Sequence, residues 1–543
     1  MNHSDHQSID WRGQAVLLIM PLYLVSAVFI LRGHAGPFSQ WDLLDPAYFY
    51  LFDSLNLIAG NVPGHIAHPG VPVYSLGALM MHLSHFGDGA DAIITAVIAD
   101  PETYLARMSS LFIVMAGVGL WAVGRAAWRT FGGLLPAVAC QLAPFMSTIV
   151  VKHMFLPRPE SLVAFTTLLF LAVILSALRR RDGKSELEHR PLFFALAFGV
   201  VAGFGVSVKI IMAPVFILPL LLPGVRRMAL PYMFISGAAF LIFALPAAGA
   251  ATEFADYLSK MALGAGKYGS GAQTVIDPAA YPKTFIKILK RPSLKVPLAL
   301  ALITLALVYW QRRRNPTTET REARFLMAVT CAQLAQVTVV AKQAVAFYMI
   351  PSYMLSALSV VLSARLLWTL ASARLPHRIS GTHAGFAGLV IILTVQASGL
   401  MRLDAHVKNR LDHAQMTNND TFKQCARIYE FAASSQMYAL NLADRVTGFR
   451  FTERLRAVTP ENDFWIDDWN TREPWILRNP DGPVALTALR QHYPCLYLRG
   501  NRINGLDKYL EREAPGLAYS KKCSTGDEPV YTIGVDCNGA LLK

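Results

Sequence analysis

The feature that most constrains this chain is its division into apolar blocks of about 16 to 24 residues, separated by short polar stretches. Blocks of this length can cross a bilayer as helices, whereas the core of a soluble protein uses shorter amphipathic runs. Of the 543 residues, 54% are hydrophobic and only 16% are charged, which is too apolar for a soluble enzyme of this size. The sequence therefore predicts a mostly α, polytopic membrane helical bundle.

Eleven blocks qualify as spanning helices. They cover residues 15–32, 105–128, 132–151, 160–178, 191–208, 210–223, 229–248, 294–310, 325–341, 347–368 and 383–400. If the N-terminus is cytoplasmic, basic loops such as the one with Arg226 and Arg227 all fall inside, as the positive-inside rule requires. The odd number of spans then places the tail outside. We expect a multi-pass protein of a bacterial inner membrane, with a transmembrane domain at 1–400 and a periplasmic domain at 401–543.

The tail carries four of the six cysteines, at positions 425, 495, 523 and 537. Four cysteines in an oxidising compartment predict two disulfides, with three pairings open, and reduced buried thiols are the alternative. A predicted helix at Thr421–Arg445 precedes β-like runs at Cys495–Leu498 and Val530–Val535. This pattern predicts a small α+β domain.

The net charge of +14 raises the question of a nucleic-acid partner. The lysines and arginines cluster in short loops beside apolar blocks, and no nucleic-acid-reading motif interleaves aromatic residues with them. The charge therefore indicates membrane topology, and we expect membrane lipid but no nucleic acid among the partners.

The first external loop, 33–106, contains no lysine or arginine and is rich in carboxylates and aromatic side chains. Its segment WDLLDPAYFY places Asp42 and Asp45 at the outer end of the first span. A partly buried carboxylate there can act as a general base, because burial raises its pKa toward neutrality. The alternative is that Asp45 caps a helix that begins at Pro46. The apolar stretch Val71–Phe86 predicts a re-entrant or juxtamembrane helix.

A Gly- and Pro-rich segment of the same loop, NVPGHIAHPGVP, contains His65 and His68. This segment is suited to folding over the mouth of a cavity. The spacing of the histidines permits a divalent cation, but loop histidines are more often hydrogen-bonded than metal-bound. We assign no metal and no cofactor.

A group of ionisable residues, KHMFLPRPE, stands between the third and fourth predicted spans on the outer side. Lys152 and Arg158 suit phosphate oxygens, and Glu160 is placed to orient Arg158. The alternative is a structural ion pair that ties two helix ends together.

Further cations lie at the outer ends of later blocks. Lys209 lies in GFGVSVKIIMAP, Lys342 precedes Tyr348 in AKQAVAFYMIP, and Lys267 lies in the second long external loop. A lipid phosphate entering from the outer leaflet would meet these groups while its tail lies between helices. Snorkelling to the interface explains each lysine singly but less readily explains the set.

The order of these segments resembles the GT-C membrane glycosyltransferases, including bacterial relatives of the protein O-mannosyltransferases and the aminoarabinose transferases. The resemblance covers most of residues 10–400. It is carried by DPAYFY, AHPGVP, LARMSSLF, RPESLVAF, GFGVSVK and KQAVAFYMIP. This chain departs from many relatives in having Pro46 after Asp45, and Gly70 after Pro69.

The resemblance implies transfer of a sugar from a polyprenyl-phosphate donor to a lipid, glycan or protein acceptor at the periplasmic face. Asp45 matches the catalytic aspartate of the family's first loop, and Asp42 is a candidate to share its role. The cations listed above and Tyr348 would hold the donor phosphate, and Tyr48 would lie with the two histidines and Glu160 on the acceptor or loop side.

Two other functions are compatible with the same residues. Intramembrane cations also mark the pathways of transporters and flippases, although the sequence has no internal repeat. A scaffold whose tail binds an envelope partner would tolerate replacement of Asp45 and Arg158. The sugar and the acceptor are not specified by the sequence.

Overall fold

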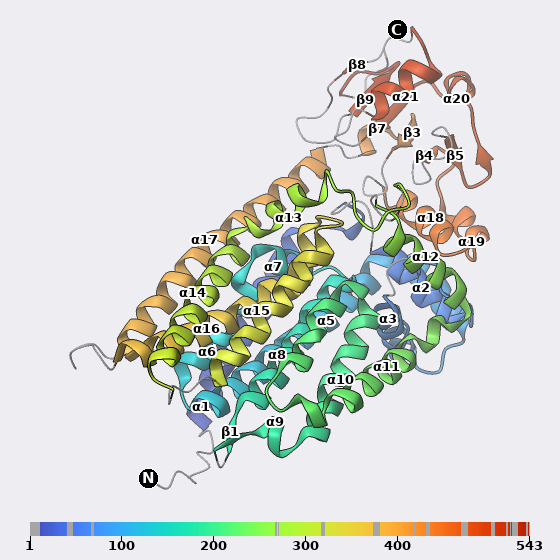
Figure 1. Cartoon of the computed structure of the whole chain (residues 1–543). Helices are drawn as coiled ribbons and strands as arrows, with labels where there is room; N and C mark the ends of the chain where they lie inside the picture. Colours follow the sequence, from blue (N-terminus) through green and yellow to red (C-terminus); the bar gives the residue numbers. More distant parts are fainter. Residues whose placement is uncertain are drawn as a thin grey trace. The chain divides into compact units, whose positions relative to one another are not determined.

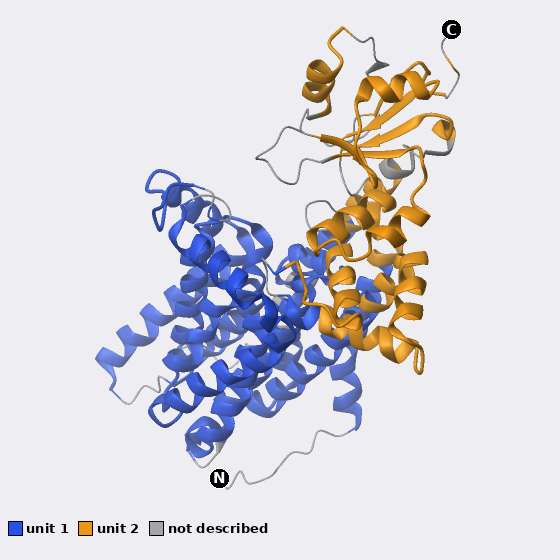
Figure 2. Ribbon diagram, turned by 90° about the vertical axis from the view of Figure 1, so that its right-hand side faces the viewer, with its two compact units in different colours: residues 1–30, 66–73, 109–401 blue, residues 31–65, 74–108, 402–543 orange. Residues whose placement is uncertain are grey.

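The computed structural model describes the chain outside residues 1–10, 41–46, 67–69, 182, 266–268, 270, 317–320, 373–380, 417–418, 431–434, 468–475, 501–504, 517–519, 522, 524–529, 539–540 and 542–543. The described residues form two compact units, coloured in Figure 2. The membrane unit comprises residues 1–30, 66–73 and 109–401. The loop-and-tail unit comprises residues 31–65, 74–108 and 402–543, so the long first loop groups with the tail.

Eight segments of the described chain are long and apolar enough to cross a membrane. They are α1 (Trp11–His34), α5 (Pro101–Phe131), α8 (Pro159–Leu178), α10 (Pro191–Val208), the stretch Ala229–Leu263, α14 (Pro292–Arg314), α15 (Arg321–Val340) and the stretch Ala346–Ala371. The stretch 229–263 contains α11 (Ala229–Ala244), η5 (Leu245–Ala250) and α12 (Ala251–Leu263), and the last stretch contains η7 (Ala346–Met349) and most of α16 (Ile350–Ser372). The predicted helical membrane bundle is confirmed.

Two of the other three predicted spans have different structures, and the third, 383–400, is helical. Residues 132–151 are divided into α6 (Leu134–Gln141), η2 (Ala143–Met146) and α7 (Thr148–Met154), and residues 210–223 form the 3-10 helix η3 (Ile210–Leu221). Prolines explain both departures, because a proline has no amide hydrogen to donate within a regular α-helix. Pro144 lies at the start of η2, which follows α6, and Pro214 and Pro219 lie inside η3. Residues 383–400 lie within the 36-residue helix α17 (Gly381–Met416).

Packing in the membrane unit depends on close helix contacts, which Figure 1 shows as adjacent ribbons. Helix α8 packs on α10 and α16, and α10 packs on α11. A Cβ atom at Gly203 would lie 2.5 Å from both Ala239 Cβ and Phe240 N, and one at Gly199 would lie 2.7 Å from Ile235 Cγ2. These two glycines, four residues apart, let the backbones of α10 and α11 approach closely, as small residues do in membrane helices.

Shorter helices form the first part of the loop-and-tail unit. They are α2 (Tyr48–Ile58), most of α3 (Val71–Ser84), α4 (Ala90–Ala99), α18 (Gln436–Val446) and α19 (Thr452–Val458). The predicted helix at 71–86 is thus present as α3. Helix α18 packs on α2, and α19 packs on α4, where Arg454 Nη2 lies 2.7 Å from Asp91 Oδ1. The tail is therefore anchored on elements of the first loop.

A seven-stranded sheet forms the rest of this unit, in the order β6-β5-β4-β3-β7-β9-β8. Its strands are β3 (Ala426–Tyr429), β4 (Asp463–Asp467), β5 (Ile476–Asn479), β6 (Gly482–Pro483), β7 (Leu496–Arg499), β8 (Ser520–Lys521) and β9 (Val530–Ile533). The central strand β3 is parallel to β4 and β7, and the other pairings are antiparallel. Helices α20 (Leu486–His492) and α21 (Gly505–Glu513) contribute apolar residues to its core. The predicted α+β tail is confirmed.

The predicted helix at 421–445 is wrong in its first half. Residues 419–422 form the 3-10 helix η8 (Asn419–Phe422), residues 426–429 form β3, and only 436–446 are helical, as α18. Strand pairing with Asp463 and Leu496, both distant in sequence, outweighs the local helical pattern. The predicted strands at 495–498 and 530–535 correspond to β7 and β9.

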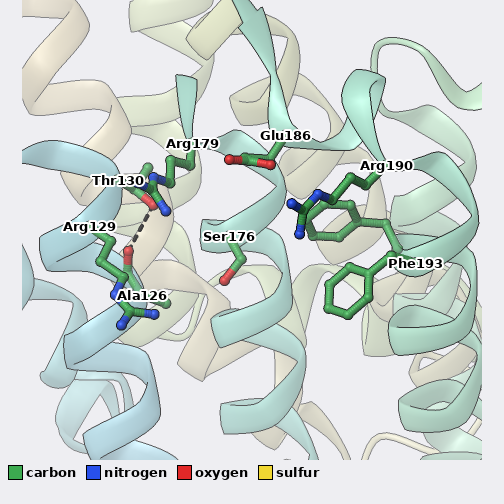
Figure 3. Close-up of a pocket in the computed structure, with 9 residues that line it drawn as sticks. Ala126, Arg129, Thr130, Ser176, Arg179, Glu186, Arg190 and Phe193 are labelled. Atoms are coloured by element: carbon green, nitrogen blue, oxygen red, sulfur yellow. Dashed lines mark hydrogen bonds between the residues drawn. The ribbon is translucent and has the colours of Figure 1, made fainter. Parts of the chain in front are cut away.

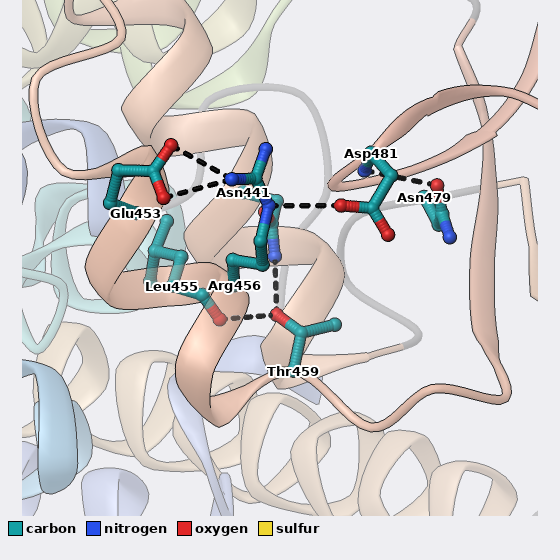
Figure 4. A network of polar contacts seen from close by, with 7 residues as sticks. All are labelled: Asn441, Glu453, Leu455, Arg456, Thr459, Asn479 and Asp481. Atoms are coloured by element: carbon teal, nitrogen blue, oxygen red, sulfur yellow. Dashed lines mark hydrogen bonds and ion pairs between the residues drawn. The ribbon is translucent and has the colours of Figure 1, made fainter.

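Two disulfides and a polar network stabilise the tail. Cys425 is bonded to Cys495, and Cys523 is bonded to Cys537, which confirms the predicted number and selects one of the three pairings. Arg456 bridges Glu453 on α19 and Asp481 beyond β5, with its Nη1 atom 2.8 Å from Glu453 and its Nε atom 2.9 Å from Asp481 (Figure 4). This contact links the helices of the tail to its sheet.

Candidate functional site

The first turn of α8 concentrates charge in the membrane unit. Arg158 is the N-cap residue, Pro159 occupies the first helical position, and Glu160 follows within the first turn. Proline suits this position because its missing amide hydrogen has no partner there, and a carboxylate near a helix N-terminus is favoured by the helix dipole. The Ser161 hydroxyl donates to the Arg158 carbonyl over 2.6 Å and fixes the turn.

Glu160 lies between two cations. The Lys209 ammonium group, which follows α10, donates a hydrogen bond to Glu160 Oε1. Arg158 Nε lies 3.7 Å from Glu160 Oε2, which is an ion-pair distance longer than a hydrogen bond. The exposed fractions of Glu160, Lys209 and Arg158 are only 4%, 4% and 6%. The structure therefore brings Arg158, Glu160 and Lys209 together in one buried cluster.

The charges of this trio do not cancel, since one carboxylate faces an ammonium and a guanidinium group. In a low-dielectric interior a surplus positive charge is costly unless an anion or a dipole compensates it. Guanidinium and ammonium groups are the usual ligands of phosphate oxygens. The arrangement is chemically suited to binding an anion of one or two charges.

Aromatic side chains close one side of the trio. Lys209 Nζ lies 4.8 Å from the centre of the Tyr348 ring and 5.2 Å from that of Phe347, within the range of cation–π attraction. The His153 ring lies 4.9 Å from the Phe347 ring. Tyr348, a predicted donor-site residue, thus lies beside Lys209 in the structure, and its role at the phosphate stays a prediction. Phe347 and His153 complete the wall and were not predicted as site residues.

A buried polar ladder holds this aromatic wall, and sequence reasoning missed it. The Gln336 amide donates to the Tyr348 carbonyl over 2.8 Å, and its oxygen accepts from the Ser352 backbone over 3.0 Å. One turn away, Gln333 donates to the Ser352 carbonyl over 2.9 Å and to the Ser356 hydroxyl over 3.1 Å. Glutamines three residues apart in an apolar helix were the available signal, because buried amides need partners.

Gly70, which directly precedes α3, meets the end of α10. The Gly70 amide donates to the Val208 carbonyl over 3.1 Å, directly before Lys209. Gly70 has φ of 56°, a left-handed conformation that favours glycine. The backbone conformation at position 70 therefore favours the glycine by which this chain departs from the family pattern.

Comparison with solved structures returns two similar chains. One is the crystal structure of ArnT from Cupriavidus metallidurans bound to undecaprenyl phosphate, with 14% sequence identity and a TM-score of 0.46, covering 96% of this chain and 99% of that chain. The other is ArnT from the same organism in the apo state, with 14% identity and a TM-score of 0.49, covering 96% and 98%. This chain resembles ArnT. No family model and no curated protein matches the sequence.

Other predicted phosphate ligands are placed differently. Lys152 lies in the last turn of α7 and is partly exposed. The Lys342 ammonium group donates to the carbonyls of Met261 and Ala262, over 2.6 and 2.7 Å, at the end of α12. In the structure Lys342 therefore caps a helix terminus, and its role at the donor phosphate stays a prediction. Lys267 lies outside the described residues.

The first-loop carboxylates Asp42 and Asp45 also lie outside the described residues, as does His68. Asp53, which follows them, is fully buried in the loop-and-tail unit. It accepts hydrogen bonds from the backbone amides of Gly64 over 2.8 Å and His65 over 3.1 Å. Burial raises the pKa of Asp53 to about 7, although these hydrogen bonds oppose the shift.

His65 and Tyr48 are held by neighbours in the same unit. The His65 ring packs edge-on against Phe49 and Tyr50, with ring centres 5.1 and 5.4 Å apart. The Tyr48 hydroxyl donates to Glu102 Oε1 over 2.5 Å, and Glu102 also accepts from the backbone amide of Phe38. Both side chains thus order the first loop, and their acceptor role stays a prediction.

No group of three or more His, Cys, Asp or Glu side chains suited to a metal ion occurs among the residues that the structure describes. The observed trio contains a single carboxylate and two cations. Cations of this kind suit an anionic ligand directly.

Proposed function

We propose that this protein is an integral-membrane glycosyltransferase that moves a sugar from a polyprenyl-phosphate carrier to an acceptor at the periplasmic face. The observation that carries the proposal is the buried trio of Arg158, Glu160 and Lys209, with its surplus positive charge at the N-terminal end of α8. The sequence resemblance to GT-C transferases supports the same reading. The basic loop at the other end of α8 supports an outer location for the trio.

Charge matching explains why a phosphodiester suits the trio. A sugar linked to polyprenyl phosphate carries one negative charge on its diester, which equals the surplus of two cations over one carboxylate. When the bond between the sugar carbon and the phosphate oxygen breaks, the leaving phosphate gains negative charge. Arg158 and Lys209 then attract the leaving group more strongly than the bound donor, and this difference lowers the barrier.

Glu160 acts as the positioning residue of this arrangement. It accepts a hydrogen bond from Lys209 at Oε1 and attracts Arg158 at Oε2, so both cations are held at one carboxylate before the donor arrives. Pre-oriented charges need no reorganisation during the reaction. The aromatic wall of Phe347 and Tyr348 excludes water from Lys209 and so strengthens its attraction to the phosphate.

The acceptor hydroxyl or amine would attack the anomeric carbon as the phosphate leaves, through an oxocarbenium-like transition state, and one displacement inverts that centre. Its proton would pass to a first-loop carboxylate. Asp45 is assigned as this base by its match to the family motif, with Asp42 as the candidate to share the role.

The test is sugar transfer by the purified full-length protein in lipid vesicles, using a panel of radiolabelled polyprenyl-phosphate sugars. Wild type is compared with Asp45→Asn and Asp42→Asn, and donor binding is recorded in parallel. Asp91→Asn is the matched control, because Asp91 lies in the same loop but is exposed and paired with Arg454.

Donor-dependent transfer that Asp45→Asn abolishes, with donor binding retained, supports the proposal and its base. Loss of transfer in Asp42→Asn, with transfer retained in Asp45→Asn, would assign the base to Asp42. Carrier movement across the vesicle without transfer overturns the proposal and identifies a flippase. Binding without transfer or movement identifies a scaffold.

A further inference from the structure

A second site lies at the other end of the same two helices. Helix α8 (Pro159–Leu178) carries Glu160 in its first turn and Ser176 in its last turn. Helix α10 (Pro191–Val208) carries Phe193 in its first turn and ends directly before Lys209. At about 1.5 Å per residue, Glu160 and Ser176 are separated by roughly 24 Å along α8. This distance approaches the thickness of the hydrocarbon core, so the two ends of α8 face opposite leaflets.

A cavity of about 230 Å³ opens at this far end, and arginines surround it. Figure 3 shows Arg129 and Arg179 on one side, Arg190 with Phe193 on the other, and Ser176 between them. Glu186 is the single acidic residue of the lining. Among the residues that the structure describes, no ion pair joins any of these three arginines to a carboxylate. The cavity is therefore electropositive.

An apolar groove of about 540 Å³ continues from this cavity along the helices. The two share Arg129, Ser176 and Phe193, and the groove extends over Trp121, Leu169 and Val200 toward the middle of α10. Arg125 also borders it and lies 4.9 Å above the Trp121 ring. A charged mouth that leads into an apolar channel matches one molecule with a phosphate at its end and hydrocarbon behind it.

We propose that this groove binds an anionic phospholipid of the leaflet opposite the trio, with its phosphate among Arg129, Arg179 and Arg190 and an acyl chain along the groove. Snorkelling explains single arginines at a membrane surface, but it does not explain a concave apolar channel that begins between them. Basic pockets between membrane helices are a known way of holding lipid headgroups. The inference does not depend on the reaction at the trio.

The experiment is native mass spectrometry of the full-length protein released from nanodiscs that contain equal amounts of phosphatidylglycerol and phosphatidylcholine. The charge variant is Arg129→Gln with Arg179→Gln. The matched control is Arg226→Gln with Arg227→Gln, a basic pair of another loop that does not line the cavity. A third variant, Ala172→Phe, fills the apolar groove without changing charge.

Wild type and the Arg226/Arg227 control are expected to retain phosphatidylglycerol over phosphatidylcholine. The charge variant should lose at least about tenfold in retained phosphatidylglycerol, since each removed arginine weakens attraction to an anionic headgroup. Ala172→Phe should lower retention with the arginines intact. Both variants place their changes on partly exposed or exposed residues, so folding is preserved and is checked by size-exclusion chromatography.

Equal retention in the charge variant and the control would overturn the proposal, as would equal retention of the two lipids by wild type. Displacement of the lipid by glycerol 3-phosphate at the same concentration would assign the arginines to a soluble phosphate instead. Unchanged retention of phosphatidylglycerol in Ala172→Phe would show that the acyl chain does not lie in the groove.

Discussion

Lys209 and Glu160, which are 49 residues apart in sequence, form a buried hydrogen-bonded ion pair at the junction of α8 and α10. Each is 4% exposed. Such a pair contributes little stability relative to apolar residues, but removing one partner leaves the other as an uncompensated buried charge. Burying these two charges therefore costs free energy that stability of the fold does not require, and such pairs are typical of functional sites.

Replacing Glu160 with Gln is expected to destabilise the membrane unit strongly, because Arg158 and Lys209 then lack their shared carboxylate. The loss should be about 3 to 5 kcal/mol. Thermal unfolding in one detergent, compared with wild type, measures it. The matched control is Glu322→Gln, which breaks the half-exposed pair with Arg365 and should cost less than about 1 kcal/mol. Equal shifts of Tm in the two variants would contradict a compensating role for Glu160.

The protonation of Asp53 should make stability depend on pH. Its pKa is about 7 in the fold against 3.8 ordinarily, so between pH 4 and pH 7 the unfolded chain releases a proton that the folded chain keeps. Stability is then greatest below pH 4 and falls as pH rises to 7, by at most about 1.4 kcal/mol per pH unit. Asp53→Asn retains an oxygen acceptor and should flatten this part of the profile.

The measurement is Tm between pH 4 and pH 8 for wild type, Asp53→Asn and the control Asp91→Asn. Asp91 is exposed, so its replacement should leave the slope unchanged. A slope that Asp53→Asn does not alter would show that the pKa of Asp53 is not raised in the fold.

The disulfide pairing gives a direct test of the tail. Cys425 and Cys495 precede β3 and β7, whose first residues, Ala426 and Leu496, are paired in the sheet. The bridge closes a separation of 70 residues, so replacing both cysteines with Ser should cost about 4 kcal/mol of tail stability. The shorter Cys523–Cys537 bridge, with a separation of 14, should cost about 3 kcal/mol. Non-reducing peptide mapping checks the pairing, and a peptide that joins Cys425 to Cys523 would contradict it.

Much of the fold could be predicted because of a simple rule: a helix that crosses the lipid bilayer must be long and apolar. Long apolar blocks such as Pro159–Leu178 are recognisable in sequence without knowledge of their partners. The rule fails where prolines interrupt a block, as Pro214 and Pro219 do in η3. It also fails at β3, because strand pairing depends on residues far along the chain, such as Asp463 and Leu496.

The candidate site was predicted in part for a similar reason. Charged residues in apolar surroundings stand out, so Arg158, Glu160 and Lys209 could be selected from the sequence alone. Which of several lysines join them could not be predicted, because that depends on how helix ends meet. Lys342, for example, reaches the carbonyls of α12 instead.

This difference between two lysines gives the sharpest test of the donor site. Lys209→Met removes a cation from the trio while Arg158 still compensates Glu160, so the protein should fold but sugar transfer should fall about a hundredfold. Lys342→Met removes only two hydrogen bonds to carbonyls, so it should lower Tm and change transfer less than tenfold. Transfer rates and Tm of both variants, measured in one lipid mixture, separate the effects. If Lys342→Met abolishes transfer while Lys209→Met does not, the donor phosphate binds near the end of α12, and the trio is a structural ion cluster.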